Sequence, residues 1–229
     1  MNLKNALTES LPKYSCDLPY SKIKTKFRPF LVKEEKKLLI LEETSSQAEI
    51  YNGIIEVLEA CFSENVDFRK LPLFEVEYCF LKLRAKSVGE LIAPKIVCPV
   101  TGESHVVSVD LNEINLKINE NPESIELGNN FILHMRYPSV GDLIDDSGDI
   151  NTLVSNCIVS FEDKTEKVEA DNFSKSEIKD FLENMTSSQY EKIIAFFEKM
   201  PSLEIKVQYQ TKDLEVRELT LKGIKDFFS

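Results

Sequence analysis

The sequence predicts a mixed α+β protein in which helices pack on short antiparallel β-hairpins. Two observations point to this class. Apolar residues recur at helical spacing in several segments of the 229-residue chain, which is the pattern of helices with one buried face. Near residues 96 and 203 the period changes to that of strands around polar turns. A helix followed by a hairpin is therefore expected twice along the chain.

The N-terminal part contains one irregular segment and two helices. Residues 1–21 lack periodicity, and Pro29 limits the segment after them to an edge strand or a loop. We therefore expect residues 1–30 to form an N-terminal arm that ends in an edge strand. Residues 32–43 combine strong helix formers with an apolar run that also suits a buried strand, and the helix is favoured. Residues 47–63 carry a clear helical stripe of apolar side chains.

A third helix and a first hairpin follow. Pro72 suits the first turn of a helix, and Gly89 marks the end of its apolar stripe. Residues 96–111 predict two strands around a polar turn, and further short strands are expected at 116–118 and 131–135.

The next segment is predicted to be mainly helical. A helix is expected over residues 150–159, and a hairpin or loop over 161–172. Two capping boxes, in which a Ser or Thr precedes a Glu or Gln by three residues, begin at Ser174 and Thr186. Such pairs satisfy the free N–H groups of a helix start, so each box predicts a new helix.

The chain is predicted to end in a second hairpin and a short helix. Residues 203–209 alternate between apolar and polar side chains, as in a half-buried strand, and residues 214–221 return beside them. The two helix-then-hairpin units are expected to resemble zinc-ribbon knuckles without metal. The predicted divisions are the arm at 1–30, a helical layer with the first hairpin at 31–137, and a helical region with the second hairpin at 138–229; a single continuous domain is the alternative.

Composition narrows the function classes. The formal net charge is −11, and an acidic chain repels a phosphate backbone, which makes nucleic acid an unfavoured partner. One local basic strip leaves open the alternative of a nucleic-acid-binding regulator. Its members are Lys22, Lys24, Lys26, Arg28 and Lys33.

Cysteine usage and hydropathy indicate the compartment. The chain has 5 cysteines, an odd number, and none form a C-x-x-C pair, which is typical of a reducing compartment. An apolar leader and a segment of membrane-spanning length are both absent from the sequence. We expect a protein made in the cytoplasm, with no membrane partner.

Chemical motifs do not favour an enzyme. Cys98 and His105 are the residues from which a zinc site, or a nucleophile with its base, would be built. A zinc knuckle needs a second ligand three residues after Cys98, and that position is Thr101, which is not a ligand. The only other histidine, His134, lies in a predicted strand. Phosphate-binding loops and hydrolase motifs do not occur. We therefore assign no catalytic, cofactor-binding or metal-binding residues.

Four segments occur in an informative order along the chain. They are Phe27-Arg28-Pro29-Phe30, Leu71-Pro72 with the helix end at 83–90, Val109-Asp110-Leu111, and the ending from Phe196-Phe197 to Phe227-Phe228. Together they resemble the baseplate hub family of T-even-type contractile-tailed phages. Many members of that family are expected to carry paired cysteines in both hairpin turns, whereas this sequence keeps only Cys98.

The resemblance implies a protein that binds other tail or baseplate hub proteins. It leaves two roles open, a structural hub subunit and an assembly chaperone, and it brings no catalytic residues. The implied locations are the host cytoplasm during assembly and the baseplate of the virion. The expected partner contacts are the helix-to-hairpin junction, at Arg84, Ser87 and Gly89, and the C-terminal pair Phe227 and Phe228. The oligomeric state stays open.

Overall fold

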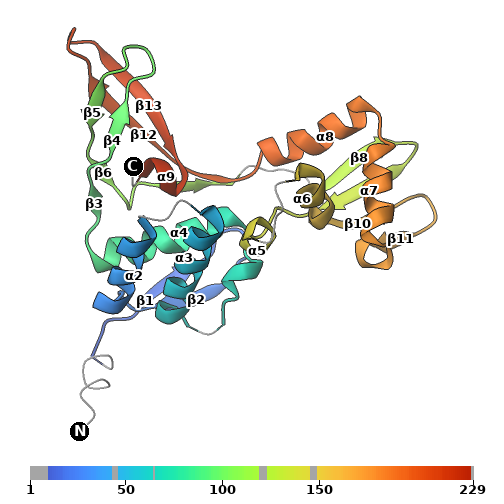
Figure 1. Cartoon of the computed structure of the whole chain (residues 1–229), viewed down its shortest axis with the longest axis horizontal. Coiled ribbons are helices and arrows are strands. Elements are labelled where there is room, and N and C mark those ends of the chain that lie inside the picture. Colours follow the sequence, from blue (N-terminus) through green and yellow to red (C-terminus); the bar gives the residue numbers. More distant parts are fainter. Residues whose placement is uncertain (1–9, 43–45, 64, 119–122, 145–148, 228–229) are drawn as a thin grey trace. The chain divides into compact units, whose positions relative to one another are not determined.

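The protein forms two compact units. Unit 1 comprises Met1–Lys117 and Ser202–Ser229, and unit 2 comprises Ile118–Pro201. Both contain helices and antiparallel strands, which confirms the predicted mixed class. The computed structural model describes residues 10–42, 46–63, 65–118, 123–144 and 149–227 (Figure 1).

These units divide the chain at other places than the divisions expected after residues 30 and 137. The reason is a strand pairing between distant segments. β12 (Ser202–Gln210) pairs antiparallel with β7 (Asn115–Lys117), so the chain leaves unit 1 after β7 and returns to it at β12. Local periodicity carries no sign of such a return.

The described part of unit 1 begins with a hairpin, where an irregular arm ending in an edge strand was expected. β1 (Tyr14–Asp17) pairs antiparallel with β2 (Lys24–Phe27). The edge strand expected after residue 21 is present as β2, but β1 makes the preceding segment part of the fold. Hydrophobic burial explains this, because Cys16 is buried and Phe27 stacks on Phe62 with ring centroids 4.9 Å apart.

Three helices follow and confirm the predicted ranges. They are α2 (Val32–Glu42), α3 (Gln47–Cys61) and α4 (Leu73–Ser87), the last preceded by the short 3₁₀ helix η1 (Phe68–Lys70). α2 and α3 pack closely because Gly53 has no side chain. A Cβ at this position would meet the side chain of Leu41.

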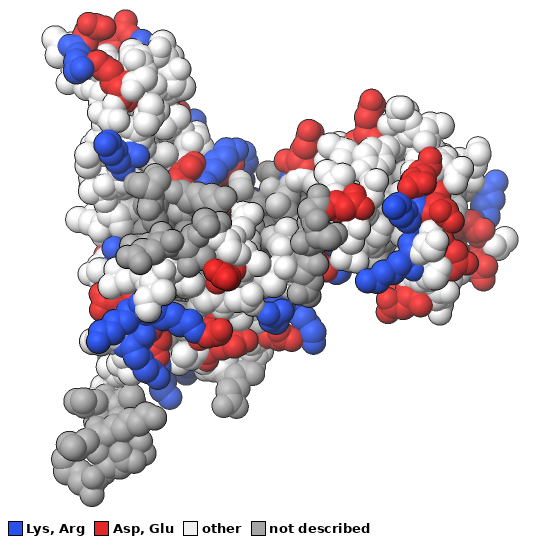
Figure 2. Space-filling view, viewed as in Figure 1, with Lys and Arg blue, Asp and Glu red and all other residues white. Residues whose placement is uncertain are grey.

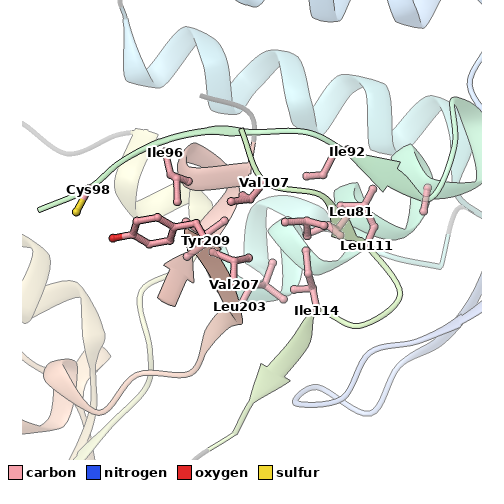
Figure 3. Packing of buried hydrophobic residues seen from close by; sticks show 13 residues of the cluster. Leu81, Ile92, Ile96, Cys98, Val107, Leu111, Ile114, Leu203, Val207 and Tyr209 are labelled. Atoms are coloured by element: carbon pink, nitrogen blue, oxygen red, sulfur yellow. The ribbon is translucent and has the colours of Figure 1, made fainter. Parts of the chain in front are cut away.

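Two hairpins of unit 1 share one hydrophobic core with α4. The first is β4 (Lys95–Val97) with β5 (Ser104–Val106), continued by the pair β3 (Leu91–Ile92) and β6 (Val109–Asp110). The second is β12 with β13 (Val216–Lys222), followed by α9 (Gly223–Phe227). The core between them contains Leu81, Ala85, Ile92, Ile96, Cys98, Val107, Val109, Leu111, Ile114, Leu203, Val207, Tyr209 and Leu221 (Figure 3). The predicted hairpins are confirmed, and their packing makes them one scaffold.

Unit 2 is built on an antiparallel sheet of four strands in the order β11-β10-β9-β8. The strands are β8 (Ser124–Gly128), β9 (Phe131–Met135), β10 (Ile158–Glu162) and β11 (Lys167–Glu169). The helical elements are α5 (Val140–Ile144), α6 (Ile150–Cys157), η2 (Ala170–Asn172), α7 (Lys175–Glu183) and α8 (Ser187–Glu198).

Both predicted capping boxes are present, at Ser174 and at Thr186. The helix expected over residues 150–159 ends earlier, at Cys157, because Ile158 begins β10. The sheet interior decides this boundary, since Ile158 and Ser160 are buried on the strand. β8 and α5 were not predicted.

Candidate interaction surface

The end of α4 is held by hydrogen bonds among the residues predicted to contact a partner. The Arg84 guanidinium donates to the Gly89 carbonyl oxygen at 3.1 Å. The Ser87 hydroxyl donates to the Leu83 carbonyl at 2.6 Å and accepts the N–H of Phe30 at 3.0 Å. Gly89 has φ = 143°, a conformation that suits glycine. The structure thus brings Arg84, Ser87 and Gly89 together and ties the segment before α2 to this junction.

An apolar groove lies beside this junction. It has a volume of about 340 Å³. Its lining comes from α2, α3, α4 and α9, from Phe30 two residues before α2, and from Val88 directly after α4. The lining residues are Phe30, Glu35, Leu38, Leu39, Leu41, Ile50, Ile54, Phe80, Arg84, Val88 and Ile224. We call this feature the α2–α4 groove.

Aliphatic side chains remain in contact with solvent at the α2–α4 groove. Leu39 is 56% exposed and Val88 is 55% exposed. The neighbouring α2 residue Ile40 is also largely exposed. The two charged groups of the lining, Glu35 and Arg84, are of opposite sign. Because exposed apolar surface of this kind marks interaction sites, the groove is suited to an apolar segment of another protein.

The second predicted contact, at the C-terminus, is only partly described. Phe228 and the side chain of Phe227 lie outside the described residues. Ile224, one turn earlier in α9, lines the α2–α4 groove. Its N–H donates to the Glu77 carboxylate on α4 at 3.4 Å. The C-terminal helix and the junction at Arg84 therefore contribute to one surface.

Cys98 lies buried between the two hairpins of unit 1, beside the ring of Tyr209 (Figure 3). Hydrogen bonds from the hydroxyls of Thr101 and Tyr209, together with those from the backbone N–H groups of Thr101 and Val100, lower the pKa of the thiol to about 6. The Arg217 guanidinium lies 3.9 Å from the sulfur. The turn thus stabilises a thiolate within the scaffold.

Comparison with known proteins decides the family. The family model described as T4 bacteriophage base plate protein matches residues 11–229. The chain belongs to this family. Neither a curated protein nor a solved structure matches it.

Membership makes the chain a phage baseplate protein, and its expected partners are other baseplate proteins. The resemblance found in the sequence is thereby confirmed at the level of the baseplate family. Among the residues that the structure describes, no helix is long and apolar enough to cross a membrane.

The hairpin of this baseplate protein does not offer the ligands that a metal knuckle needs. Within the described parts of the chain, no three His, Cys, Asp or Glu side chains are grouped to hold a metal ion. The ring of His105 packs on that of Tyr209, with centroids 4.8 Å apart. The sulfur of Cys98 accepts a hydrogen bond from the Tyr209 hydroxyl. The neighbour of the thiol is thus a hydrogen-bond donor and not a histidine base.

Tyr209 and Arg217 are the residues at Cys98 that the sequence-based search for ligands did not find. Both come from the second hairpin, more than 100 positions away in the chain. The alternation of residues 203–209 places Tyr209 on the buried face of its strand, which is the one available signal. The pairing of the two hairpins is needed to bring it to Cys98.

Part of the basic strip is engaged inside unit 1. The carboxylate of Glu34 is buried and lies 3.1 Å from the Arg28 guanidinium and 3.2 Å from the Lys33 ammonium. It also accepts the N–H of Leu31 at 2.7 Å. Burial alone raises the pKa of this carboxyl, but these donors outweigh it and hold the pKa below its usual value. Two of the five cations of the strip therefore serve an internal ion pair.

Proposed function

We propose that this protein acts in the hub of the phage baseplate by binding a second baseplate protein in the α2–α4 groove. The observation that carries the proposal is the combination of baseplate family membership with an open groove whose rim exposes Leu39 and Val88. Covering an aliphatic side chain of this size contributes about 1.5–3 kcal/mol to association when its burial is complete. The proposed role is binding and not catalysis.

The proposed occupant is an amphipathic helix or a short apolar segment with two or three aliphatic side chains. A groove between helices accepts such a segment through side chains spaced by one helical turn. Glu35 and Arg84, of opposite charge, favour one orientation of the segment over the reverse.

The predicted contact residues divide into two roles in this proposal. Arg84 belongs to the surface itself, since it lines the groove. Ser87 and Gly89 hold the end of α4 in place through their hydrogen bonds. Phe227 is the last residue of α9, which carries Ile224 in the groove lining, and Phe228 follows it in the sequence. Both are proposed to enlarge the apolar contact.

The hairpin pair is proposed to be a scaffold that resembles a zinc ribbon without metal. The support is the turn at Cys98, where backbone N–H groups and hydroxyls surround the sulfur. The scaffold holds α4 through Leu81 and Ala85. In this proposal it sets the position of the groove and takes no part in chemistry.

Complementation of a phage that lacks this gene tests the groove. We expect the double variant Leu39→Glu/Val88→Glu to restore few infectious particles, because two buried charges would oppose the apolar contact. The matched control is Val106→Glu, which adds the same charge at another exposed valine of unit 1 and is expected to restore infection. Equal restoration by both variants, or intact infectious tails without the gene, would show that the proposal is wrong.

Mass spectrometry of purified virions separates the two hub roles. A structural subunit is present at a fixed copy number. An assembly chaperone, which acts in the host cytoplasm, is absent from the virion although the gene is required. Both outcomes keep the groove as the binding surface, so the complementation result stands independently.

A further inference from the structure

A second candidate surface lies in unit 2, on the side of the sheet covered by α7. It is an open pocket of about 390 Å³. Four phenylalanines line it, together with Val168 and Ile178. The four are Phe131 on β9, Phe161 on β10, Phe173 before α7, and Phe181 on α7. We call it the phenylalanine pocket.

The rings of the phenylalanine pocket pack edge to face around Phe161. The centroids of Phe173 and Phe181 are each 5.1 Å from that of Phe161, at interplanar angles of 80° and 85°. Phe131 lies 5.7 Å from Phe181. Phe161 is buried, whereas Phe173 is 38% exposed. The cluster therefore closes the core of unit 2 on one side and presents aromatic surface to solvent on the other.

Three carboxylates, Asp163, Glu166 and Glu177, belong to the lining of this aromatic surface. Asp163 accepts the hydroxyl and the N–H of Thr165 and the N–H of Glu166, at 2.6, 2.7 and 3.0 Å. These hydrogen bonds lower the pKa of Asp163. The capping box of Ser174 does the same for Glu177, first through the Ser174 hydroxyl. Asp163 and Glu177 therefore keep their negative charge at a lower pH than ordinary carboxylates do.

These carboxylates have no cation of their own in the described part of the chain. Nowhere among the described residues does a Lys, Arg or His nitrogen lie within 4.0 Å of Asp163, Glu166 or Glu177 as an ion pair. Lys164 and Lys175 are neighbours in sequence, and both are exposed to solvent. The pocket therefore combines apolar surface with charge that is not neutralised locally.

The rest of unit 2 strengthens this field. Residues 118–201 contain 17 Asp and Glu but only 7 Lys and Arg, a formal charge of −10 out of −11 for the whole chain. On the face of unit 2 that Figure 2 shows, Asp and Glu side chains are interspersed with Lys and Arg side chains. A field of this sign attracts basic segments and repels acidic ones.

We propose that the phenylalanine pocket binds an arginine or lysine side chain carried by an exposed basic segment of another baseplate protein. The methylene stem of such a side chain packs on the rings, while its cation lies near the ring faces and meets the carboxylates. Arginine is favoured over lysine, because its planar guanidinium both stacks on rings and pairs with a carboxylate through two hydrogen bonds. The inference rests on the proposed function in assuming a baseplate partner, but it uses a different surface.

Small probes test the pocket without any phage partner. The full-length protein, labelled with ¹⁵N, is titrated with N-acetyl-arginine amide, its lysine counterpart, and the uncharged citrulline and norleucine amides. We expect saturable shifts of amide signals at Thr165, Phe173 and Phe181 with the two cations. The citrulline amide, which has nearly the shape of arginine without its charge, is expected to bind about tenfold more weakly.

Conservative variants assign the effect to the pocket. Glu166→Gln and Asp163→Asn keep the size of the side chain, and asparagine retains the acceptor oxygen of the turn. Each is expected to weaken binding of the arginine amide by about threefold or more. Phe173→Leu is expected to weaken it similarly through the lost ring face. The matched control Glu191→Gln removes an exposed charge on α8 and leaves binding unchanged.

Three results would overturn the inference. They are equal binding of the citrulline and arginine amides, shifts spread over unit 2 without focus on the pocket, and an equal loss of binding in Glu191→Gln. The groove variant Leu39→Glu/Val88→Glu, which alters only unit 1, is expected to bind the arginine amide normally. A failure of the pocket and a failure of the groove are therefore distinguishable.

Discussion

Unit 1 and unit 2 use their charged residues in different ways. Unit 1 is nearly neutral, with 22 Asp and Glu against 21 Lys and Arg, and two of its carboxylates, Glu34 and Glu75, are buried and hydrogen-bonded. In the described part of unit 2 most carboxylates are exposed, although Asp142 pairs with Arg136, and the sequence of this unit carries almost the whole net charge. The comparison teaches that an acidic chain can offer two separate surfaces, one apolar and one electrostatic.

The first prediction concerns Glu75, where the largest effect is expected. One oxygen of this carboxylate accepts the backbone N–H groups of Tyr20 and Ser21 at 2.8 and 2.9 Å, and so fixes the N-terminal hairpin to α4. Glu75→Ala leaves both donors without their acceptor and should reduce the stability of unit 1 by about 2–4 kcal/mol. Hydrogen exchange of the α4 amides measures this.

Two variants sharpen this test of the comparison. Glu75→Gln keeps an acceptor oxygen and is expected to be destabilised less than Glu75→Ala. Glu166→Gln in unit 2 is expected to change stability by no more than about 0.5 kcal/mol. Similar losses at Glu75 and Glu166 would contradict the division between internal and surface carboxylates.

The second prediction separates the surfaces by their response to salt. Raising the ionic strength from about 0.05 to 0.5 M screens exposed charges, so binding of the arginine amide to unit 2 is expected to weaken several-fold. Binding of an apolar segment to the α2–α4 groove should change little or increase slightly. Titration calorimetry at the two salt concentrations, with the arginine amide and with the partner segment once known, measures both. A strong salt dependence of binding at the groove would contradict the assignment of an apolar surface to unit 1.

The third prediction concerns Cys98, the smallest effect of the three. Its thiolate is expected to form with a midpoint near pH 6, the value set first by the Thr101 hydroxyl, visible as absorbance at 240 nm. The Cys98→Ser variant should lack this transition. Burial raises the pKa of Cys61 to about 11 and that of Cys157 to about 12, so these thiols do not interfere in this range.

The same group predicts the direction of a stability change with pH. The folded-state pKa of Cys98 lies below that of an unfolded thiol, so between about pH 6 and 9 the unfolded chain binds more protons. The free energy of unfolding of the wild type, relative to Cys98→Ser, should therefore rise over this window and fall as the pH drops through 6. Urea unfolding at pH 5.5, 7 and 8.5 checks the sign, and a difference that is flat or decreasing would contradict it.

Local signals predicted most helices and hairpins correctly. The capping boxes at Ser174 and Thr186 act within one turn of the chain, and the stripe of α3 reports its own buried face. The end of α6 at Cys157 was placed wrongly because the residues after it form β10, which pairs with β9 from an earlier part of the chain. β1 was missed because its burial depends on α4, where Cys79 contacts the buried Cys16.

The candidate surfaces show the same limit. Arg84 and Gly89 were found because they are close in sequence and belong to one helix end. The α2–α4 groove joins residues from Phe30 to Ile224, and the phenylalanine pocket joins residues from Phe131 to Phe181. Neither set has a spacing that periodicity can recognise.

The sequence by itself determined most of the helix and strand types, the acidic charge, the lack of a C-x-x-C pair at Cys98, and the likeness to baseplate proteins. These depend on composition, on contacts within a few residues, or on a pattern along the whole chain. Tertiary structure alone decided the two units, the return of β12 to β7, the donors around Cys98, and the two open surfaces. The physical reason is that burial and hydrogen bonding between distant segments choose which apolar and charged side chains are enclosed and which remain for a partner.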